Sequence, residues 1–150
     1  MQNLFNSKDY QSVLIRINKI SALSENNWGK MNVNQMVLHV KDQLDIALGH
    51  KSAAPQGPFH YRTKLCLWLK LYILPWKKNK EITPREMDSR FNGMVVTDFE
   101  NDKHLLLLRL QEFVSTSRFN DHPFYGKLTK KDWGRLAWKH INHHLMQFGE

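Results

Sequence analysis

The sequence contains one cysteine, Cys66, so an internal disulfide is excluded. Cys66 stands between two leucines, and we expect a small buried side chain there rather than a reactive thiol. The chain has no Cys-x-x-Cys pair, glycine-rich phosphate loop or Gly-x-Ser-x-Gly sequence, so the chemistries that depend on these motifs are not indicated. No apolar run reaches the about 20 residues that a membrane-spanning helix needs.

The first residues of the sequence do not resemble a secretory signal. Residues 1–9 lack a basic stretch followed by an apolar run, and we therefore expect a cytoplasmic protein. The chain has 150 residues, of which 41% are hydrophobic and 24% charged, and these values are typical of one globular domain. We expect a single domain over residues 1–150.

Apolar residues recur at helical spacing, whereas strand-type alternation is absent, so the sequence predicts an all-α fold. Amphipathic helices are expected over about residues 8–20, 32–48, 99–114 and 129–148. Asn32 with Gln35 is typical of a helix start, and Gly49 of a helix end. Thr129 and Asp132 form a second predicted cap.

Residues 61–74 are strongly apolar and end before Pro75, which predicts one shorter helix that is buried or lies at an interface. A membrane-surface anchor is the alternative. Four amphipathic helices and one shorter apolar helix together predict an antiparallel four-helix bundle, a fold that builds metal sites from side chains on facing helices.

Positive charge is concentrated in one region. The net charge is +8, and residues 60–90 contribute +5 of it, from eight basic and three acidic residues. We expect a solvated loop there, with attraction of anionic molecules as the alternative. Residues 76–97 are predicted to form a long connection of the kind that makes a lid or rim.

His140 and His144 lie four residues apart on the apolar side of the last predicted helix. Their Cβ atoms are expected about 5–6 Å apart, so both rings could reach one divalent ion. A buried pair satisfied by hydrogen bonds or water is the alternative. His143, at the flank of this side, is predicted to lie behind the ligands or at an entrance, or else to be a surface imidazole.

A third ligand should come from another helix. His39 is the preferred candidate, because it borders the apolar side of the second predicted helix. His104 projects away from its helix's apolar side, and His50, His60 and His122 fall in predicted loops. Zincin-type proteolysis is disfavoured, since the positions that would need glutamate hold Ile141 and His143.

Two regions carry a resemblance to a known family, and the second, near the C-terminus, has two parts. Residues 28–40 read Trp-Gly-Lys-Met-Asn-Val-Asn-Gln-Met-Val-Leu-His-Val. Residues 122–129 read His-Pro-Phe-Tyr-Gly-Lys-Leu-Thr, and residues 133–149 read Trp-Gly-Arg-Leu-Ala-Trp-Lys-His-Ile-Asn-His-His-Leu-Met-Gln-Phe-Gly. These stretches resemble the DinB-like (YfiT-like) metalloenzyme superfamily, in a branch of unknown function. Residues 50–97 carry no matching motif.

The resemblance implies a four-helix bundle that holds one divalent ion, usually nickel or zinc, between a histidine of the second helix and a His-x-x-x-His pair of a later helix. In this chain the metal ligands would be His39, His140 and His144. Some members of the superfamily transfer low-molecular-weight thiols to electrophiles or isomerise substrates with a thiol cofactor. The resemblance thus predicts the metal more firmly than the reaction.

The leading hypothesis is a divalent-metal-dependent enzyme, a transferase or hydrolase, acting on a small-molecule substrate. Three neutral imidazoles leave positions at which the ion can hold water or a thiol and lower its pKa. Gln43 and Gln147, one turn beyond His39 and His144, are candidates to orient a ligand or a bound water, with helix-surface glutamines as the alternative. A basic cluster could attract the carboxylates of an acidic thiol: Lys77, Lys78, Lys80 and Arg85.

Two further hypotheses about function do not involve catalysis. A non-catalytic basic module could contact nucleic acid or a membrane through Trp68, Trp76 and Trp138. Both partners are disfavoured, because the basic residues do not form a recognition helix and no nucleic-acid-binding motif occurs. A homodimer that associates through residues 65–74 is the remaining alternative.

Overall fold

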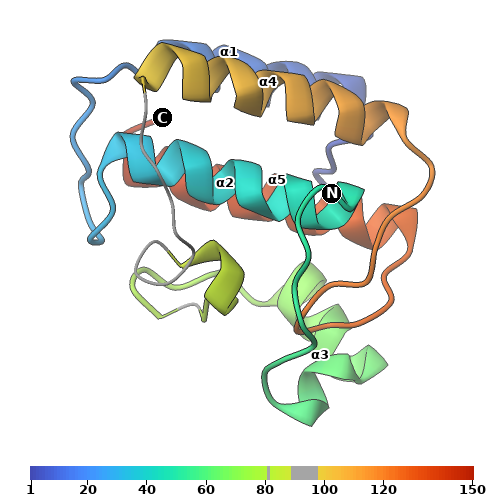
Figure 1. Ribbon diagram of the computed structural model, residues 1–150. Coiled ribbons are helices and arrows are strands. Elements are labelled where there is room, and N and C mark those ends of the chain that lie inside the picture. Colours follow the sequence, from blue (N-terminus) through green and yellow to red (C-terminus); the bar gives the residue numbers. More distant parts are fainter. Residues whose placement is uncertain (81, 89–97) are drawn as a thin grey trace.

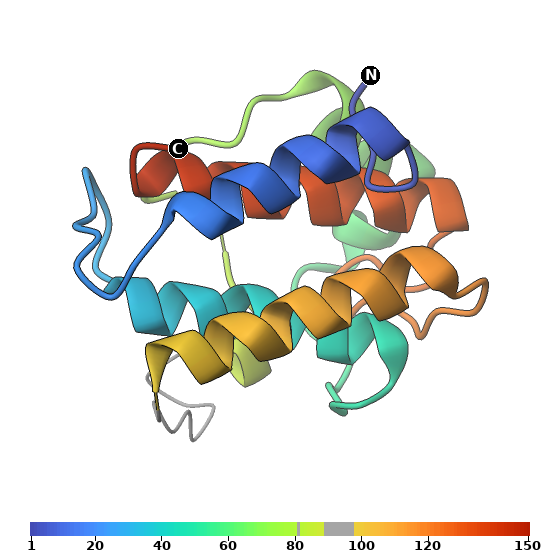
Figure 2. The ribbon, with the colours of Figure 1, turned by 90° about the horizontal axis from the view of Figure 1, so that it is seen from above.

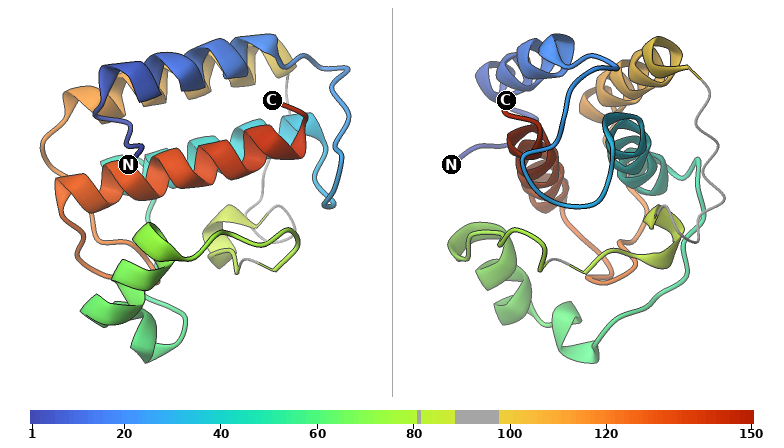
Figure 3. Two further views of the ribbon diagram at one scale, coloured as in Figure 1. Left: turned by 180° about the vertical axis from the view of Figure 1, so that it is seen from behind. Right: turned by 90° about the vertical axis from the view of Figure 1, so that its left-hand side faces the viewer.

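The computed structural model describes residues 1–80, 82–88 and 98–150, and all regular elements within these ranges are helices. The predicted all-α class is therefore confirmed for this part of the chain. Four helices are long: α1 (Ser7–Lys19), α2 (Val33–Leu48), α4 (Phe99–Ser115) and α5 (Lys130–Gln147). They lie in two layers, with α1 beside α4 in one and α2 beside α5 in the other (Figures 1 and 3).

The chain directions of these helices follow from contacts at their ends. The Leu4 N–H donates to the Gly134 carbonyl at 3.2 Å, and Lys19 pairs with Glu150 at 3.0 Å. Helices α1 and α5 therefore begin together and end together, and run in the same direction, as Figure 2 also shows. The Asn27 N–H donates to the Gln147 carbonyl at 2.8 Å, so α2 begins where α5 ends.

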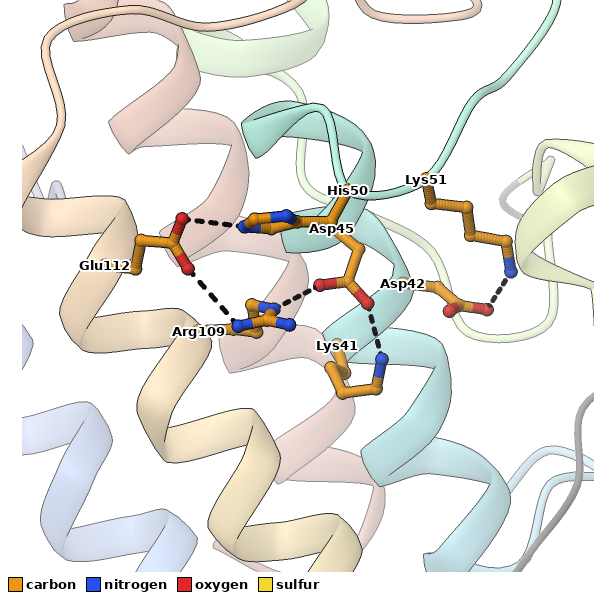
Figure 4. Close-up of polar contacts among 7 residues, drawn as sticks. All are labelled: Lys41, Asp42, Asp45, His50, Lys51, Arg109 and Glu112. Carbon is orange, nitrogen blue, oxygen red and sulfur yellow. Dashed lines mark hydrogen bonds and ion pairs between the residues drawn. The ribbon is translucent and has the colours of Figure 1, made fainter.

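Helices α2 and α4 also run in the same direction. Asp45, in the last turn of α2, accepts from Arg109 at 2.6 Å, and His50 lies 2.7 Å from Glu112 (Figure 4). The Asn120 N–H, just beyond α4, donates to the Ala47 carbonyl at 2.9 Å. The predicted antiparallel bundle, which short connections between successive helices would give, is therefore not confirmed, because two neighbouring pairs are parallel.

Local capping explains where the helices begin and end. Asn32 accepts from the Gln35 N–H while the Gln35 side chain accepts from the Asn32 N–H, which is the predicted capping box of α2. Gly49 has a φ of +86°, and its N–H donates to the carbonyls of Asp45 and Ile46. Thr129 and Asp132 cap α5 in the same way as α2 is capped. These predictions are confirmed.

The core lies between the two layers. Its largest fully buried side chains come from all four long helices and include Ile17, Leu44, Leu110, Phe113 and Trp133. Gly134 lets the amino-terminal segment approach α5, because a Cβ there would lie 2.2 Å from Asn3 Oδ1 and 2.4 Å from the Phe5 ring. This contact explains why glycine stands within a helix, where it is otherwise unfavourable.

The apolar segment predicted as one helix over residues 61–74 begins with a 3-10 turn, η1 (Phe59–Arg62). After Thr63 a helix runs without a break from α3 (Lys64–Trp68) into the π-helical turn η2 (Leu69–Ile73). Thr63 is extended, and its hydroxyl accepts from the Cys66 N–H, so it ends η1 and caps α3. Leu71 is fully buried, whereas Leu65 is largely exposed. A helix is therefore present as predicted, starting at Lys64, and it is buried on one side only, while an interface on its other side stays a prediction.

Residues 76–80 and 82–88 continue from this segment and contain one 3-10 turn, η3 (Arg85–Met87). The remainder of the predicted long connection, Glu81 and residues 89–97, lies outside the described residues. Within the described ranges, the helices are all too short or too polar to cross a bilayer.

Candidate functional site

The structure brings together His39 of α2 with His140 and His144 of α5. One nitrogen of each ring lies within 4.8 Å of the others, and each pair of ring centroids is 4.7 Å apart. All three side chains are buried. The convergence expected from the sequence arises because α2 and α5 lie side by side, so the middle of α2 faces the second half of α5 (Figure 1).

The hydrogen bond of His39 fixes its tautomer. Its Nδ1 lies 2.9 Å from the Met87 carbonyl oxygen, which can only accept, so Nδ1 carries the proton and donates. The lone pair of His39 is therefore on Nε2. This nitrogen lies 2.8 Å from Nε2 of His140. Helix α2 and the η3 turn together hold the ring in place.

The tautomer of His144 is fixed through Gln147. The Gln147 amide Nε2 donates to the Trp28 carbonyl at 2.7 Å, so its Oε1 faces His144 Nδ1 at 3.0 Å. Since Oε1 can only accept, His144 Nδ1 is the donor and the His144 lone pair is on Nε2. Metal-binding histidines in proteins are commonly oriented in this way by a hydrogen bond to the other ring nitrogen.

Gly29 makes room for this arrangement. Its φ is +89°, a conformation that favours glycine, and a Cβ there would lie 2.3 Å from Gln147 Nε2. A larger residue would displace the amide that orients His144. The Trp-Gly sequence at residues 28–29 therefore serves the site through its backbone.

His140 has no comparable partner for its Nδ1, which is buried without a hydrogen bond to any described residue. If Nε2 carries the proton, it donates to His39 and leaves Nδ1 as an unpaired acceptor. If Nδ1 carries it, two Nε2 lone pairs face each other at 2.8 Å. A cation between the rings would remove this repulsion, so the donor set fits a metal ion, and imidazole nitrogen is a preferred ligand of zinc and nickel.

Burial keeps the cluster uncharged near neutral pH. Loss of solvation lowers the pKa of His39, with the Met87 carbonyl acting in the opposite direction, and lowers the pKa values of His140 and His144 well below 6.5. Repulsion between protonated rings of the cluster lowers the pKa values of His140 and His144 further. The lone pairs are therefore available to a cation without prior loss of a proton.

A cavity of about 610 Å³ borders the cluster, and the three histidines form part of its wall. Gln43 and Trp76 also line it, and each has a buried polar atom, Oε1 and Nε1 respectively, that bonds to no described residue. Gln43 and Gln147 are both buried, so the alternative of helix-surface glutamines is wrong. His143 is half-buried, with its ring edge-on to Trp28 at 4.7 Å and to Trp76 at 5.8 Å.

His122 was assigned to a predicted loop, but it is buried and lines the same cavity. Its Nδ1 accepts from the N–H groups of Phe124 and Tyr125 at 3.1 and 3.3 Å. Burial lowers the pKa of His122 to about 3. Helical periodicity could not find this residue, although it lies in one of the stretches that carry the family resemblance.

Three histidines lie apart from the cluster. His50 pairs with Glu112 on the α4 side of α2 (Figure 4). His60 is exposed and stacks edge-on against Tyr61. His104 is exposed on α4. The sequence-based exclusion of these three agrees with their positions.

Replacing Gln147 with leucine is expected to weaken zinc binding by about 10- to 100-fold, because His144 loses the acceptor that fixes its tautomer. Gln147→Glu should give an intermediate affinity, since a carboxylate oxygen can still accept from Nδ1 but no longer donates to the Trp28 carbonyl. Competition with a chromogenic chelator measures both affinities, and ¹⁵N shifts of the ring report the tautomer. Gln111→Leu, on the exposed side of α4, is the matched control. Equal affinities for Gln147→Leu and the control would show that this amide has no positioning role.

The fold and site define an all-helical protein with a buried three-histidine cluster at the wall of a cavity. Comparison with family models matches residues 6–150 to the family described as "Protein of unknown function (DUF1569)", and the chain belongs to this family. No curated protein and no solved structure matches the chain.

Proposed function

We propose that this protein is a divalent-metal-dependent enzyme whose metal ligands are His39, His140 and His144. The observation that carries the proposal is the geometry of the cluster: three buried rings with ligand nitrogens within 4.8 Å of one another, beside a cavity of about 610 Å³. Two of the rings are held by hydrogen bonds that leave an Nε2 lone pair free. Zinc and nickel are the ions that we propose.

We also propose that the four long helices form a four-helix bundle of the DinB-like (YfiT-like) type. Support comes from the ligand positions, one on the second long helix and two on the last, as the resemblance implies. The parallel pairs described above would then mark a bundle with long crossover connections. In such bundles, sites are built from side chains of facing helices, as α2 and α5 face each other here (Figure 3).

A bound divalent ion would supply Lewis acidity, which lowers the pKa of water or of a low-molecular-weight thiol. The chain supplies the surroundings. Gln43 Oε1 can accept a hydrogen bond from a ligand, and Trp76 Nε1 can donate one. His143 and Trp28 close one side of the cavity with aromatic surface. With water as nucleophile the enzyme would be a hydrolase, and with a thiol it would be a thiol transferase acting on a small electrophile.

A cytoplasmic location suits the thiol version, because reducing compartments keep small thiols reduced. The basic residues near the cavity offer a means of attracting an acidic thiol. Lys30 lines the cavity, and Lys78 lies over the Trp28 ring at 5.6 Å from its centroid. The proposed cofactors are therefore one divalent ion and a low-molecular-weight thiol.

Cobalt substitution tests this function. The Co²⁺-loaded protein is expected to show a new sulfur-to-cobalt absorption band when glutathione or cysteine is added, because a thiol would enter an open coordination position. The His144→Ala variant should give neither the cobalt spectrum nor the band. A cobalt spectrum that no thiol changes would remove the transferase version and leave the hydrolase. Absence of any cobalt spectrum in the intact protein would contradict the proposal as a whole.

A further inference from the structure

The segment from η1 to η2 is apolar on more than one side, and among the described residues only one side packs on the core. Leu67 and Leu71 belong to or contact the core. On the other side, Leu65 and Trp68 are 67% and 50% exposed, and they lie three residues apart, one above the other on α3. Three further apolar side chains nearby in the chain are exposed too. We call these five residues the α3 face: Phe59, Leu65, Trp68, Ile73 and Leu74.

The α3 face lies at one end of the molecule. The η1, α3 and η2 elements extend from the layer formed by α2 and α5, on the side opposite to α1 and α4 (Figures 1 and 3). Elements placed in this way can meet a flat surface without obstruction by the long helices. Exposed large apolar side chains that cluster usually mark an interaction site.

The stretch of sequence that contains the α3 face carries charge of one sign, although Lys51 within it is paired with Asp42. Residues 46–80 contain no aspartate or glutamate, whereas they contain seven basic residues: Lys51, Arg62, Lys64, Lys70, Lys77, Lys78 and Lys80. The formal charge of this stretch is therefore +7. A partner that complements both properties must offer negative charge at its surface and apolar material beneath it.

We propose that the α3 face docks the protein on an anionic lipid surface. Exposed leucine, isoleucine, phenylalanine and tryptophan beside lysine and arginine are the chemistry of a peripheral membrane contact, in which apolar side chains enter the headgroup boundary and basic ones meet the lipid phosphates. This role differs from spanning the bilayer, and it does not depend on the metal site.

Two other occupants fit the α3 face less well. A second copy of the chain bound through a two-fold axis would bring the same basic region against itself, and like charges repel. Nucleic acid would satisfy the charge and could stack on Phe59 and Trp68, but it would leave Leu65, Ile73 and Leu74 exposed to water. The lipid surface accounts for both the charge and the aliphatic exposure.

Docking through the α3 face would also bring part of the wall of the cavity beside the three histidines near the membrane. Trp76, two residues beyond Leu74, lines the cavity, as do Asn79 and Ile82. The chain thus passes directly from the α3 face into the cavity wall. A protein held on a membrane by this face would present that wall close to the lipid headgroups.

Vesicle sedimentation tests the proposal on the full chain. The protein should sediment with vesicles that contain phosphatidylglycerol and much less with vesicles of phosphatidylcholine alone, and added salt should release it. The double variant Leu65→Gln with Trp68→Gln is expected to bind anionic vesicles at least about tenfold more weakly, since two apolar side chains no longer leave water. Lys64→Glu should weaken binding as well.

The matched control is Ile15→Gln with Leu23→Gln, which removes two exposed apolar side chains elsewhere on the surface. It should bind vesicles within about twofold of the unchanged protein. Circular dichroism checks that both double variants are folded, and zinc affinity should be equal in all of them.

Three results would overturn the proposal. Failure of the unchanged protein to bind anionic vesicles is the first. Equal loss of binding in the control and in the Leu65/Trp68 variant is the second. The third is a dimer, seen by light scattering, that the Leu65/Trp68 variant abolishes, because the α3 face would then join two copies of the chain. None of these results bears on the metal affinity, so the proposed function stands or falls separately.

Discussion

Alanine in place of any one of His39, His140 and His144 is expected to weaken zinc binding by at least about a hundredfold. Loss of a residue that only orients a ligand already costs about 10- to 100-fold, so loss of a direct ligand should exceed that range. The three substitutions should behave alike, because each removes one of three nitrogens in a single cluster. Competition against a chelator of known affinity, near pH 7, gives the three values.

His60→Ala and His104→Ala are the controls for this series, since both rings are exposed and lie apart from the cluster. They should bind zinc as the unchanged protein does. Full affinity in the His39→Ala variant alone would show that the third ligand was assigned wrongly, with His122 or His143 on the same cavity wall as the next candidates. Full affinity in all three variants would contradict the site.

The second large effect is a loss of stability in acid that depends on His122. Its pKa is about 3 in the folded protein and about 6.5 when unfolded, so between these values the unfolded chain takes up a proton that the folded chain does not. Stability from this residue is complete above about pH 6.5 and is lost as the pH falls toward 3. The expected slope is about 1.4 kcal/mol per pH unit.

Urea unfolding of the metal-free protein and of His122→Asn at several values between pH 7 and pH 5 isolates this contribution. The asparagine Oδ1 can replace Nδ1 as the acceptor for the N–H groups of Phe124 and Tyr125, but it does not titrate. Other buried histidines contribute to both proteins and cancel in the difference. Parallel stability curves would show that His122 takes up its proton equally in the folded and unfolded chain.

Much of the fold was accessible from the sequence because helix signals are local. The capping box at Asn32 and Gln35, the left-handed Gly49 and the cap at Thr129 all act within a few residues, and the structure contains them where they were predicted. Directions of neighbouring helices were less accessible. They depend on connections such as residues 49–58, whose path is set by contacts with distant parts of the chain.

The segment at residues 59–74 shows where local signals fail. Its composition predicts one helix, buried or at an interface, from residue 61 on, but extended Thr63 separates a 3-10 turn from a helix that begins only at Lys64, where the Thr63 hydroxyl accepts from the Cys66 N–H. Its apolar content predicts burial, yet in the part of the chain that the structure describes the core contacts come from the side with Leu67 and Leu71. A run of apolar residues indicates how much side-chain surface would be stabilised by burial. Whether other parts of the same chain bury that surface depends on the tertiary structure.

Candidate ligands could be found from spacing, whereas the groups that orient them could not. His140 and His144 share one side of α5 through the i, i+4 rule, and His39 was chosen by elimination and by resemblance. The Met87 and Trp28 carbonyls that fix His39 and, through Gln147, His144 are backbone atoms with no sequence signal. His122 was missed because a composition typical of a loop does not exclude a buried side chain.

X-ray absorption at the metal edge, on protein purified without a nickel column or imidazole, tests the central claim most directly. Elemental analysis of the same sample gives the identity and amount of the metal. We predict close to one zinc or nickel ion per chain, with a coordination shell of about three imidazole nitrogens and the remainder light atoms or a thiol. A protein that holds no divalent ion even after dialysis against zinc and nickel, or one whose bound metal shows no imidazole shell, would contradict the account.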